Sequence, residues 1–217
     1  MRVILVEDSV LLADGISRLF QAYGHHVAAA VDSAERLPDL VSEHQPDVVI
    51  LDVRLPPTYT DEGIQAALRL RRAHPRLGIL VLSQYAETVH AGDLIAESAD
   101  GYVGYLLKDR VAEAASVVDA AVSVAEGGTV IDPEVVSALL RRRANVVRTS
   151  MLSEREHEVL ALMAEGRTNA AIARALFIQE ATVVKHISNI MTKLDLPPST
   201  DHHRRVLAVL IMLGLTV

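Results

Sequence analysis

The chain contains no cysteine and no tryptophan, and only 3% of its 217 residues are aromatic. Without cysteine, neither a disulfide framework nor a Cys-ligated zinc site can form. Half of the residues are hydrophobic, so a folded core must be built almost entirely from aliphatic side chains. The longest apolar run near the end, residues 206–215, is too short to span a bilayer. The opening MRVILVEDS turns acidic too early for a signal peptide, so we expect a cytoplasmic protein without membrane association.

Lysine is also scarce, and charge is unevenly distributed. Of the 21 basic residues only Lys108, Lys185 and Lys193 are lysines. Residues 1–145 hold 13 basic and 21 acidic residues, a net charge of −8, whereas residues 146–217 hold 8 and 7, a net charge of +1. An acidic front part and a nearly neutral back part indicate two modules with different partners.

Short aliphatic runs alternate with amphipathic segments over the first 126 residues. The runs lie at 3–6, 27–31, 48–51, 79–82 and 102–107, and the amphipathic segments at 10–23, 33–44, 62–74, 86–97 and 110–126. This alternation predicts right-handed βαβ units on a parallel sheet. Ser33 and Thr60–Asp61 are candidate helix caps, and Gly24 is a candidate helix stop. We therefore expect an α/β domain with a doubly wound, five-stranded parallel sheet.

The pattern changes after Gly127 and Gly128. Residues 132–143, DPEVVSALLRRR, predict a short helix with Asp132 as N-cap and Pro133 in the first turn, followed by a polar joint at 144–150. The remainder is helical in pattern, with segments at 153–164, 168–176, 180–193 and 203–213. We predict a first domain over 1–126, a linker with a short helix over 127–150, and an all-α four-helix domain over 151–217.

Charged and polar residues stand where the predicted strands end: Glu7 and Asp8, Asp52, Ser83, and Lys108. In an open parallel sheet the carboxyl ends of the strands line the ligand crevice. Carboxylates brought together there require a cation, and hard oxygen ligands suit Mg²⁺. An acid nucleophile on a strand, a metal and a lysine are the components of phosphoryl transfer. Each also has a simpler interpretation, with Asp8–Ser9 a helix cap, Ser83 a loop hydroxyl and Lys108 a solvated amine.

Residues 1–126 resemble the receiver domain of two-component response regulators. The resemblance rests on VEDS at 6–9, ILDVRLP at 50–56, DEG at 61–63, VLSQY at 81–85 and GYLLKD at 104–109. It implies that Asp52 accepts a phosphoryl group from a sensor histidine kinase, with Ser83 and Lys108 contacting that group. It further implies that Tyr105 changes rotamer as Ser83 moves, and that Mg²⁺ is held by Glu7, Asp8, Asp52 and the main-chain carbonyl of Arg54. The PPTYTDEG loop is longer than usual for the family.

The back part has the signals of a helix-turn-helix. Ser153 and Glu156 form a capping-box pattern, Gly166 ends the first helix, and Thr168 caps the second. The third helix has a predicted buried face of Val183, Ile187, Ile190 and Leu194 and an opposite face of Thr182, Val184, Lys185, Ser188, Asn189 and Lys193. A polar-faced helix after a short turn is the arrangement that enters a DNA major groove. A small structural helical bundle is the alternative.

Residues 152–213 resemble the LuxR-type helix-turn-helix of NarL/FixJ response regulators. LSEREHEVL, EGRTNAAIA, ATVVKHISNI and TKL carry the resemblance. It implies that the helix at 180–193 reads DNA, with Lys185 and Lys193 in contact with it. Val184 stands where many relatives have lysine, and Gln179 replaces the usual Ser or Thr cap.

The last helix, RRVLAVLIMLGL, is apolar on more than one face, which is typical of a partner surface. Relatives dimerise through this helix, and the resemblance implies a homodimer contact through Val206, Leu207, Leu210 and Ile211.

Together these patterns predict a non-enzymatic, phosphorylation-controlled transcription regulator that binds promoter DNA as a dimer, with a histidine kinase and RNA polymerase as further partners. A regulator that works without phosphorylation is one alternative, and an adaptor without DNA affinity is another. A phosphatase with an aspartate nucleophile would need a second acid where Arg54 stands. A nucleotide-binding module would need a Gly-rich loop that EDSVLLADG lacks.

Overall fold

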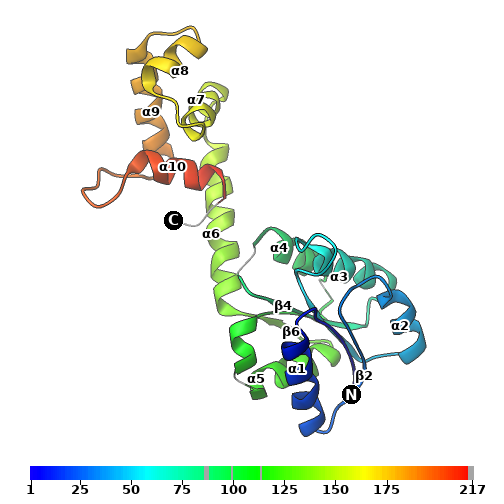
Figure 1. Cartoon of the computed structure of the whole chain (residues 1–217). Coiled ribbons are helices and arrows are strands. Elements are labelled where there is room, and N and C mark those ends of the chain that lie inside the picture. The colour runs from blue at the N-terminus through cyan, green and yellow to red at the C-terminus, as the bar shows by residue number, and fades with distance from the viewer. Residues whose placement is uncertain (86–87, 99, 113, 215–217) are drawn as a thin grey trace. The chain divides into compact units, whose positions relative to one another are not determined.

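The computed structural model describes residues 1–85, 88–98, 100–112 and 114–214. The chain divides into two compact units, residues 1–137 and 138–217. The first unit is a sheet covered by helices, and the second consists of helices, as Figure 1 shows.

The first unit is built on a parallel sheet with strand order β2-β1-β3-β4-β5-β6. The strands are β1 (Arg2–Val6), β2 (His26–Val31), β3 (Val48–Asp52), β4 (Gly78–Ser83), β5 (Val103–Leu107) and β6 (Thr129–Ile131). Every residue of β3, β4 and β5 is buried, which explains why these strands are continuous apolar runs rather than alternating ones. The predicted doubly wound parallel fold is confirmed.

The sheet differs from the prediction in its number of strands, because a sixth strand pairs with β5. β6 lies in the segment that the sequence indicated as a linker, and it continues the parallel ladder from Val103↔Thr129 to Tyr105↔Ile131. Its three residues lie between a glycine pair and the Asp132–Pro133 dipeptide, and none of them is fully buried. A run this short and this exposed carries too little periodicity to be recognised as a strand.

Helices cover both faces of this sheet. They are α1 (Val10–Ala22), α2 (Leu37–His44), α3 (Glu62–Ala73), α4 (Thr88–Ala96), the 3₁₀ helix η1 (Lys108–Ala112) and α5 (Ala114–Ala125). α1 and α5 cover one face, and α2, α3 and α4 cover the other (Figure 1). Ile16 and Phe20 of α1 and Val117 of α5 pack on Leu5 and Leu80 of the sheet in one aliphatic core.

Three helix predictions for this unit need adjustment. The predicted cap at Ser33 is wrong, because α2 begins only at Leu37 with Arg36 as N-cap. The predicted helix over 110–126 is interrupted between η1 and α5. The first two residues of the predicted helix over 86–97 lie outside the described residues, and α4 begins at Thr88.

A long helix, α6 (Pro133–Ser150), begins in the first unit and continues into the second. It extends beyond the predicted end at residue 143, so the predicted polar joint at 144–150 is helical. Asp132 caps it as predicted, with its Oδ1 accepting the Glu134 amide at 3.0 Å.

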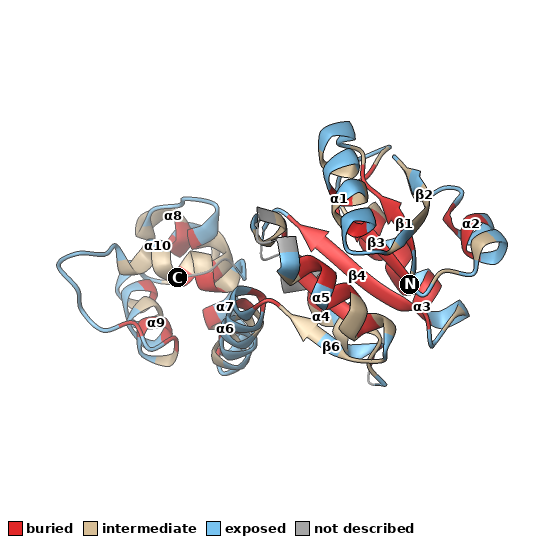
Figure 2. Cartoon of the chain, turned by 90° about the horizontal axis from the view of Figure 1, so that it is seen from below, coloured by how far each residue is buried: buried red, intermediate tan, exposed pale blue. Residues whose placement is uncertain are grey.

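The second unit also contains α7 (Glu154–Ala164), α8 (Asn169–Ala175), α9 (Glu180–Lys193) and α10 (Arg204–Met212). The predicted capping box of Ser153 and Glu156 is present, and Thr168 accepts the Ala171 amide. Buried residues of α7, α8, α9 and α10 form a separate aliphatic core, which Figure 2 marks in red. Among the described residues, no helix combines the length and the hydropathy required to cross a membrane.

Candidate functional site

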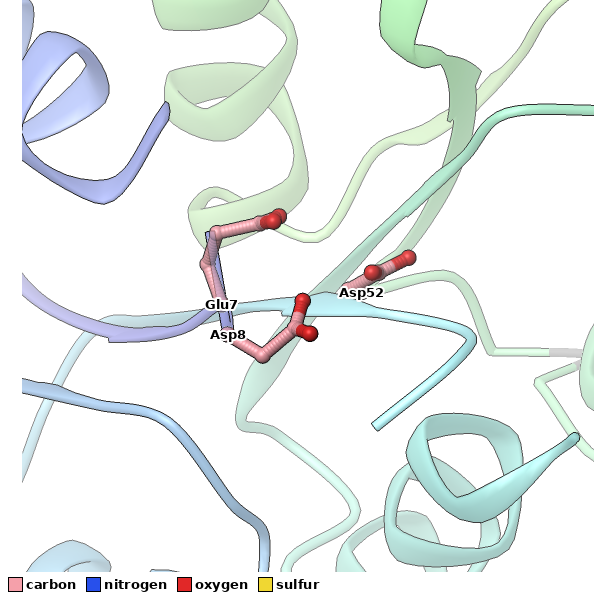
Figure 3. A group of neighbouring side chains, drawn as sticks. All are labelled: Glu7, Asp8 and Asp52. Atoms are coloured by element: carbon pink, nitrogen blue, oxygen red, sulfur yellow. The ribbon is translucent and has the colours of Figure 1, made fainter. Parts of the chain in front are cut away.

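Three carboxylates meet at the carboxyl edge of the sheet. Glu7 and Asp8 follow β1, and Asp52 ends β3. β1 and β3 are neighbours although β2 lies between them in sequence, so the chain leaves β1 in one direction and β3 in the other. A crevice opens where strand order reverses in this way. One oxygen from each carboxylate lies within 4.8 Å of the others, and Figure 3 shows the three side chains around this point.

Lys108 bonds two of these acids. It is the first residue of η1, directly after β5, and its Nζ lies 2.9 Å from Asp52 Oδ2 and 2.8 Å from Glu7 Oε2. Burial raises the pKa of Glu7, and the bonds from Lys108 only partly oppose that rise. Burial lowers the pKa of Lys108, but its bonds to the two carboxylates outweigh burial and raise it, so the ammonium stays charged. One ammonium among three carboxylates leaves an excess of negative charge that favours a cation.

The donor set fits a divalent metal. Glu7 and Asp52 are buried and Asp8 is half-buried, so the three carboxylates form a partly enclosed set of oxygen ligands. Mg²⁺ is usually bound through one or two carboxylates with several retained waters, and these three carboxylates supply ligands of that kind.

Ser83 and Tyr105 lie on the strands next to this edge. Ser83 ends β4 and is buried, and its hydroxyl donates to the Tyr85 carbonyl oxygen at 2.7 Å. Tyr105 is fully buried in β5, in register with Val81. The exposed Arg54 guanidinium lies 5.5 Å from the centre of the Tyr85 ring, a cation–π contact that sequence reasoning did not anticipate because no local pattern joins the two residues.

The predicted reading face of α9 is exposed for most of its length. Val184, Lys185, Ser188 and Asn189 are exposed, and Thr182 is half-buried. Gln179 is the N-cap residue and makes no side-chain cap bond, as the departure from Ser or Thr implied.

Lys193 has an internal partner. Its Nζ donates to Glu156 Oε2 at 2.6 Å, and Glu156 is only 3% exposed. Burial raises the pKa of Glu156, but the bonds from Lys193 and Ser153 outweigh burial and lower it overall. Lys193 therefore ties the end of α9 to the beginning of α7. Its side chain is still 37% exposed, and its DNA contact stays a prediction. Periodicity missed this pair because the residues are distant in sequence.

The predicted dimer face of α10 is only partly on the surface. Ile211 is 3% exposed and belongs to the core of the second unit, so it has no free surface for a partner. Leu207 is half-buried against the same core, Leu210 is half-buried, and Val206 is 55% exposed.

Two family models match the chain. The response regulator receiver domain matches residues 3–115, and the luxR family of bacterial regulatory proteins matches residues 150–209. The chain therefore belongs to the response regulators, with a receiver domain followed by a LuxR-type DNA-binding domain, as in the NarL/FixJ type.

Individual relatives agree over nearly the whole chain. The transcriptional regulatory protein LnrK of Bacillus subtilis is 30% identical, covering 93% of this chain and 94% of that protein. The oxygen regulatory protein NreC of Staphylococcus haemolyticus is 32% identical, covering 90% and 92%. A structure of the RcsB response regulator of Salmonella typhimurium has the same fold, with a TM-score of 0.69 at 23% identity and 99% coverage of both chains. The response regulator ChrA of a heme-sensing system is 29% identical with a TM-score of 0.51, covering 98% and 96%.

Proposed function

We propose that Asp52 is the phosphoacceptor of a phosphorylation-controlled, promoter-binding transcription regulator, and that a sensor histidine kinase supplies the phosphoryl group. The observation that supports this role best is the bond between Lys108 and Asp52 within a cluster of three carboxylates. Asp52 ends a strand whose residues are all buried, so its carboxylate is held in a fixed position for in-line attack.

In the transfer, a carboxylate oxygen of Asp52 attacks the phosphorus of a phosphohistidine. The P–N bond breaks as the P–O bond forms, and the imidazole leaves. Lys108 stabilises charge on the phosphoryl oxygens throughout. Mg²⁺, held by Glu7, Asp8, Asp52 and the main-chain carbonyl of Arg54, would neutralise the same oxygens.

The phosphoryl group carries about −1.5 to −2 charges and replaces the single negative charge of the Asp52 carboxylate, and it brings three phosphoryl oxygens as strong acceptors. Ser83 can donate to one of these acceptors only by giving up its bond to the Tyr85 carbonyl. Tyr105 would change rotamer as Ser83 moves. These rearrangements define a second packing whose population the phosphoryl group raises.

The output is binding of promoter DNA by α9. Lys185, Ser188 and Asn189 would contact DNA, Val184 would make an apolar contact such as one to a thymine methyl, and Thr182 would lie at the edge. Two copies joined through Val206, Leu207 and Leu210 of α10 would engage two half-sites together. RNA polymerase is the further partner of such a regulator.

We assign the receiver to residues 1–126, the linker to 127–150 and the DNA-binding domain to 151–217.

The test is labelling by acetyl phosphate with Mg²⁺, read as a shifted band on a phosphate-affinity gel. Asp52→Asn is expected to remove the shifted band and to keep the thermal unfolding temperature, because an amide cannot form the acyl phosphate. Asp14→Asn is the matched control, since Asp14 is exposed and pairs with Arg18 on α1, away from the carboxylate cluster. A persistent shifted band in Asp52→Asn would contradict the assignment.

A further inference from the structure

Asp132 is a buried aspartate that lies outside the phosphoacceptor pocket. It is only 1% exposed, and it forms the beginning of α6. Its Oδ1 accepts the Glu134 amide at 3.0 Å, and its carbonyl accepts the Val136 amide at 3.0 Å. The position of Asp132 therefore fixes the first turn of α6.

Asp132 is also bonded to the elements that form the pocket. Its amide donates to the carbonyl of Tyr105 in β5 at 2.8 Å, and its Oδ2 accepts from Arg110 Nε at 2.9 Å. Arg110 belongs to η1, the same short helix that begins with Lys108. The Asp132 side chain is 0% exposed, whereas that of Arg110 is 34% exposed. Burial alone would raise the pKa of Asp132, yet the bonds from Arg110 and the Glu134 amide lower it, so the carboxylate is charged and depends on Arg110.

We propose that the Arg110–Asp132 ion pair couples the position of Lys108 in the pocket to the first turn of α6. This inference rests on the proposed role of Asp52 as phosphoacceptor. Lys108 bonds Asp52 directly, so a phosphoryl group on Asp52 changes where the ammonium is held. Lys108 and Arg110 lie within one 3₁₀ helix, so a shift of one is passed to the other.

Burial of the Asp132 carboxylate keeps it paired with Arg110. A buried charge that loses its only cationic partner is strongly destabilised, so Asp132 follows Arg110 rather than separating from it. Asp132 also caps α6 by accepting the amides of Glu134 and Val136, so a displacement of Asp132 changes the hydrogen bonds of these two amides. α6 continues into the second unit, so it is the covalent route by which such a change leaves the receiver.

A second arginine–carboxylate ion pair of this unit, Arg72–Glu97, provides a control. Arg72 binds Glu97 through Nε at 2.9 Å, and it joins α3 to the residues after α4. The Arg72 side chain is 67% exposed, and the pair involves neither η1 nor α6. Losing it removes a more exposed arginine–carboxylate pair without touching the proposed link.

The test is amide hydrogen exchange of the full chain, followed by mass spectrometry, with and without beryllium fluoride and Mg²⁺. Binding of this phosphoryl mimic is measured separately by fluorine NMR. In the unsubstituted chain and in Arg72→Gln, the mimic is expected to change exchange in the peptide that covers residues 133–137. In Arg110→Gln the mimic still binds, but the exchange rates of that peptide with and without it become equal. Arg110→Lys, which restores a cation, is expected to recover part of the difference.

Asp132→Asn provides a second variant that keeps the cap acceptor but removes the charge. It too is expected to bind the mimic without a response in α6. A response of unsubstituted size in Arg110→Gln would overturn the coupling, and so would an unsubstituted chain that binds the mimic with no change in α6. Failure of the unsubstituted chain to bind the mimic would instead contradict the phosphoacceptor role, so the two failures are distinguishable.

Discussion

At the scale of single residues, the pocket depends on a residue without a side chain. Gly63 lies in the first turn of α3, and its amide donates to the Val53 carbonyl at 2.9 Å. A Cβ at this position would lie 1.7 Å from the carbonyl oxygen of Asp52. Only glycine lets α3 approach the end of β3 so closely, so the position of the phosphoacceptor depends on it.

We expect Gly63→Ala to destabilise the fold by about 1–3 kcal/mol, the usual cost of inserting atoms into a packed site. It should also reduce labelling of Asp52 by acetyl phosphate, because either α3 or the end of β3 has to move. Urea denaturation measures the first effect and the phosphate-affinity gel the second.

Gly15→Ala is the matched control for that substitution. Gly15 lies within α1 with nothing within 4 Å of its added Cβ. Alanine there is expected to stabilise the chain by about 0.5–1 kcal/mol, since glycine inside a helix is costly. Unchanged stability and labelling in Gly63→Ala would refute the importance of the close approach.

At the scale of elements, the sequence predicts best where one local pattern decides the structure. The buried strands and the capped helices have such patterns, and so do the strand-end acids that meet in the pocket. β6 was missed because pairing with β5, rather than its own three residues, makes it a strand. The continuation of α6 through 144–150 was missed because polar helix faces and polar joints have the same composition. The partner of Lys193 is a tertiary contact, which no local pattern encodes.

The two lysines of α9 therefore have different predicted roles. Lys193→Ala leaves the buried Glu156 without its cation and is expected to cost about 1–3 kcal/mol of stability. Lys185→Ala removes an exposed ammonium, and we expect weaker DNA binding at unchanged stability. Thermal unfolding and gel shifts with DNA selected from a random pool measure the two effects. The reverse pattern would contradict this division of roles.

The pH dependence of the same pair gives a further readout of the Lys193 variant. The folded-state pKa of Glu156 is below its ordinary value of 4.5. The contribution of the Glu156 carboxylate to folding stability is therefore complete above pH 4.5, and it is lost as the pH falls through the lowered pKa. Lys193→Ala should weaken this acid-side dependence, whereas Lys185→Ala should leave it unchanged.

At the scale of the whole molecule, residues 1–145 and residues 146–217 differ in charge. The acidic excess belongs to the front part of the chain, and the part that carries α9 is nearly neutral. A DNA-binding domain with so small a positive charge gains little from phosphate contacts alone. Useful affinity then requires two copies on neighbouring half-sites, which is a state that phosphorylation of the receiver can control.

We accordingly expect beryllium fluoride with Mg²⁺ to strengthen DNA binding by about 5- to 150-fold, the usual range of coupling between two sites. Gel shifts at fixed salt concentration measure the change, and Asp52→Asn should abolish it. Equal affinity with and without the mimic would instead favour the regulator that works without phosphorylation.

The scarcity of lysine has a practical consequence for the chemistry of the folded chain. Lys108 and Lys193 each donate to a buried carboxylate, so their amines are engaged. Lys185 is exposed on α9, and among the described contacts its side chain has no ion pair. Besides the terminal amine, we thus expect an amine-reactive dye to modify Lys185 ahead of the two half-buried lysines, and Lys185 lies on the helix proposed to enter DNA. Acylation of the native protein would place a reporter on its reading surface without any engineered cysteine.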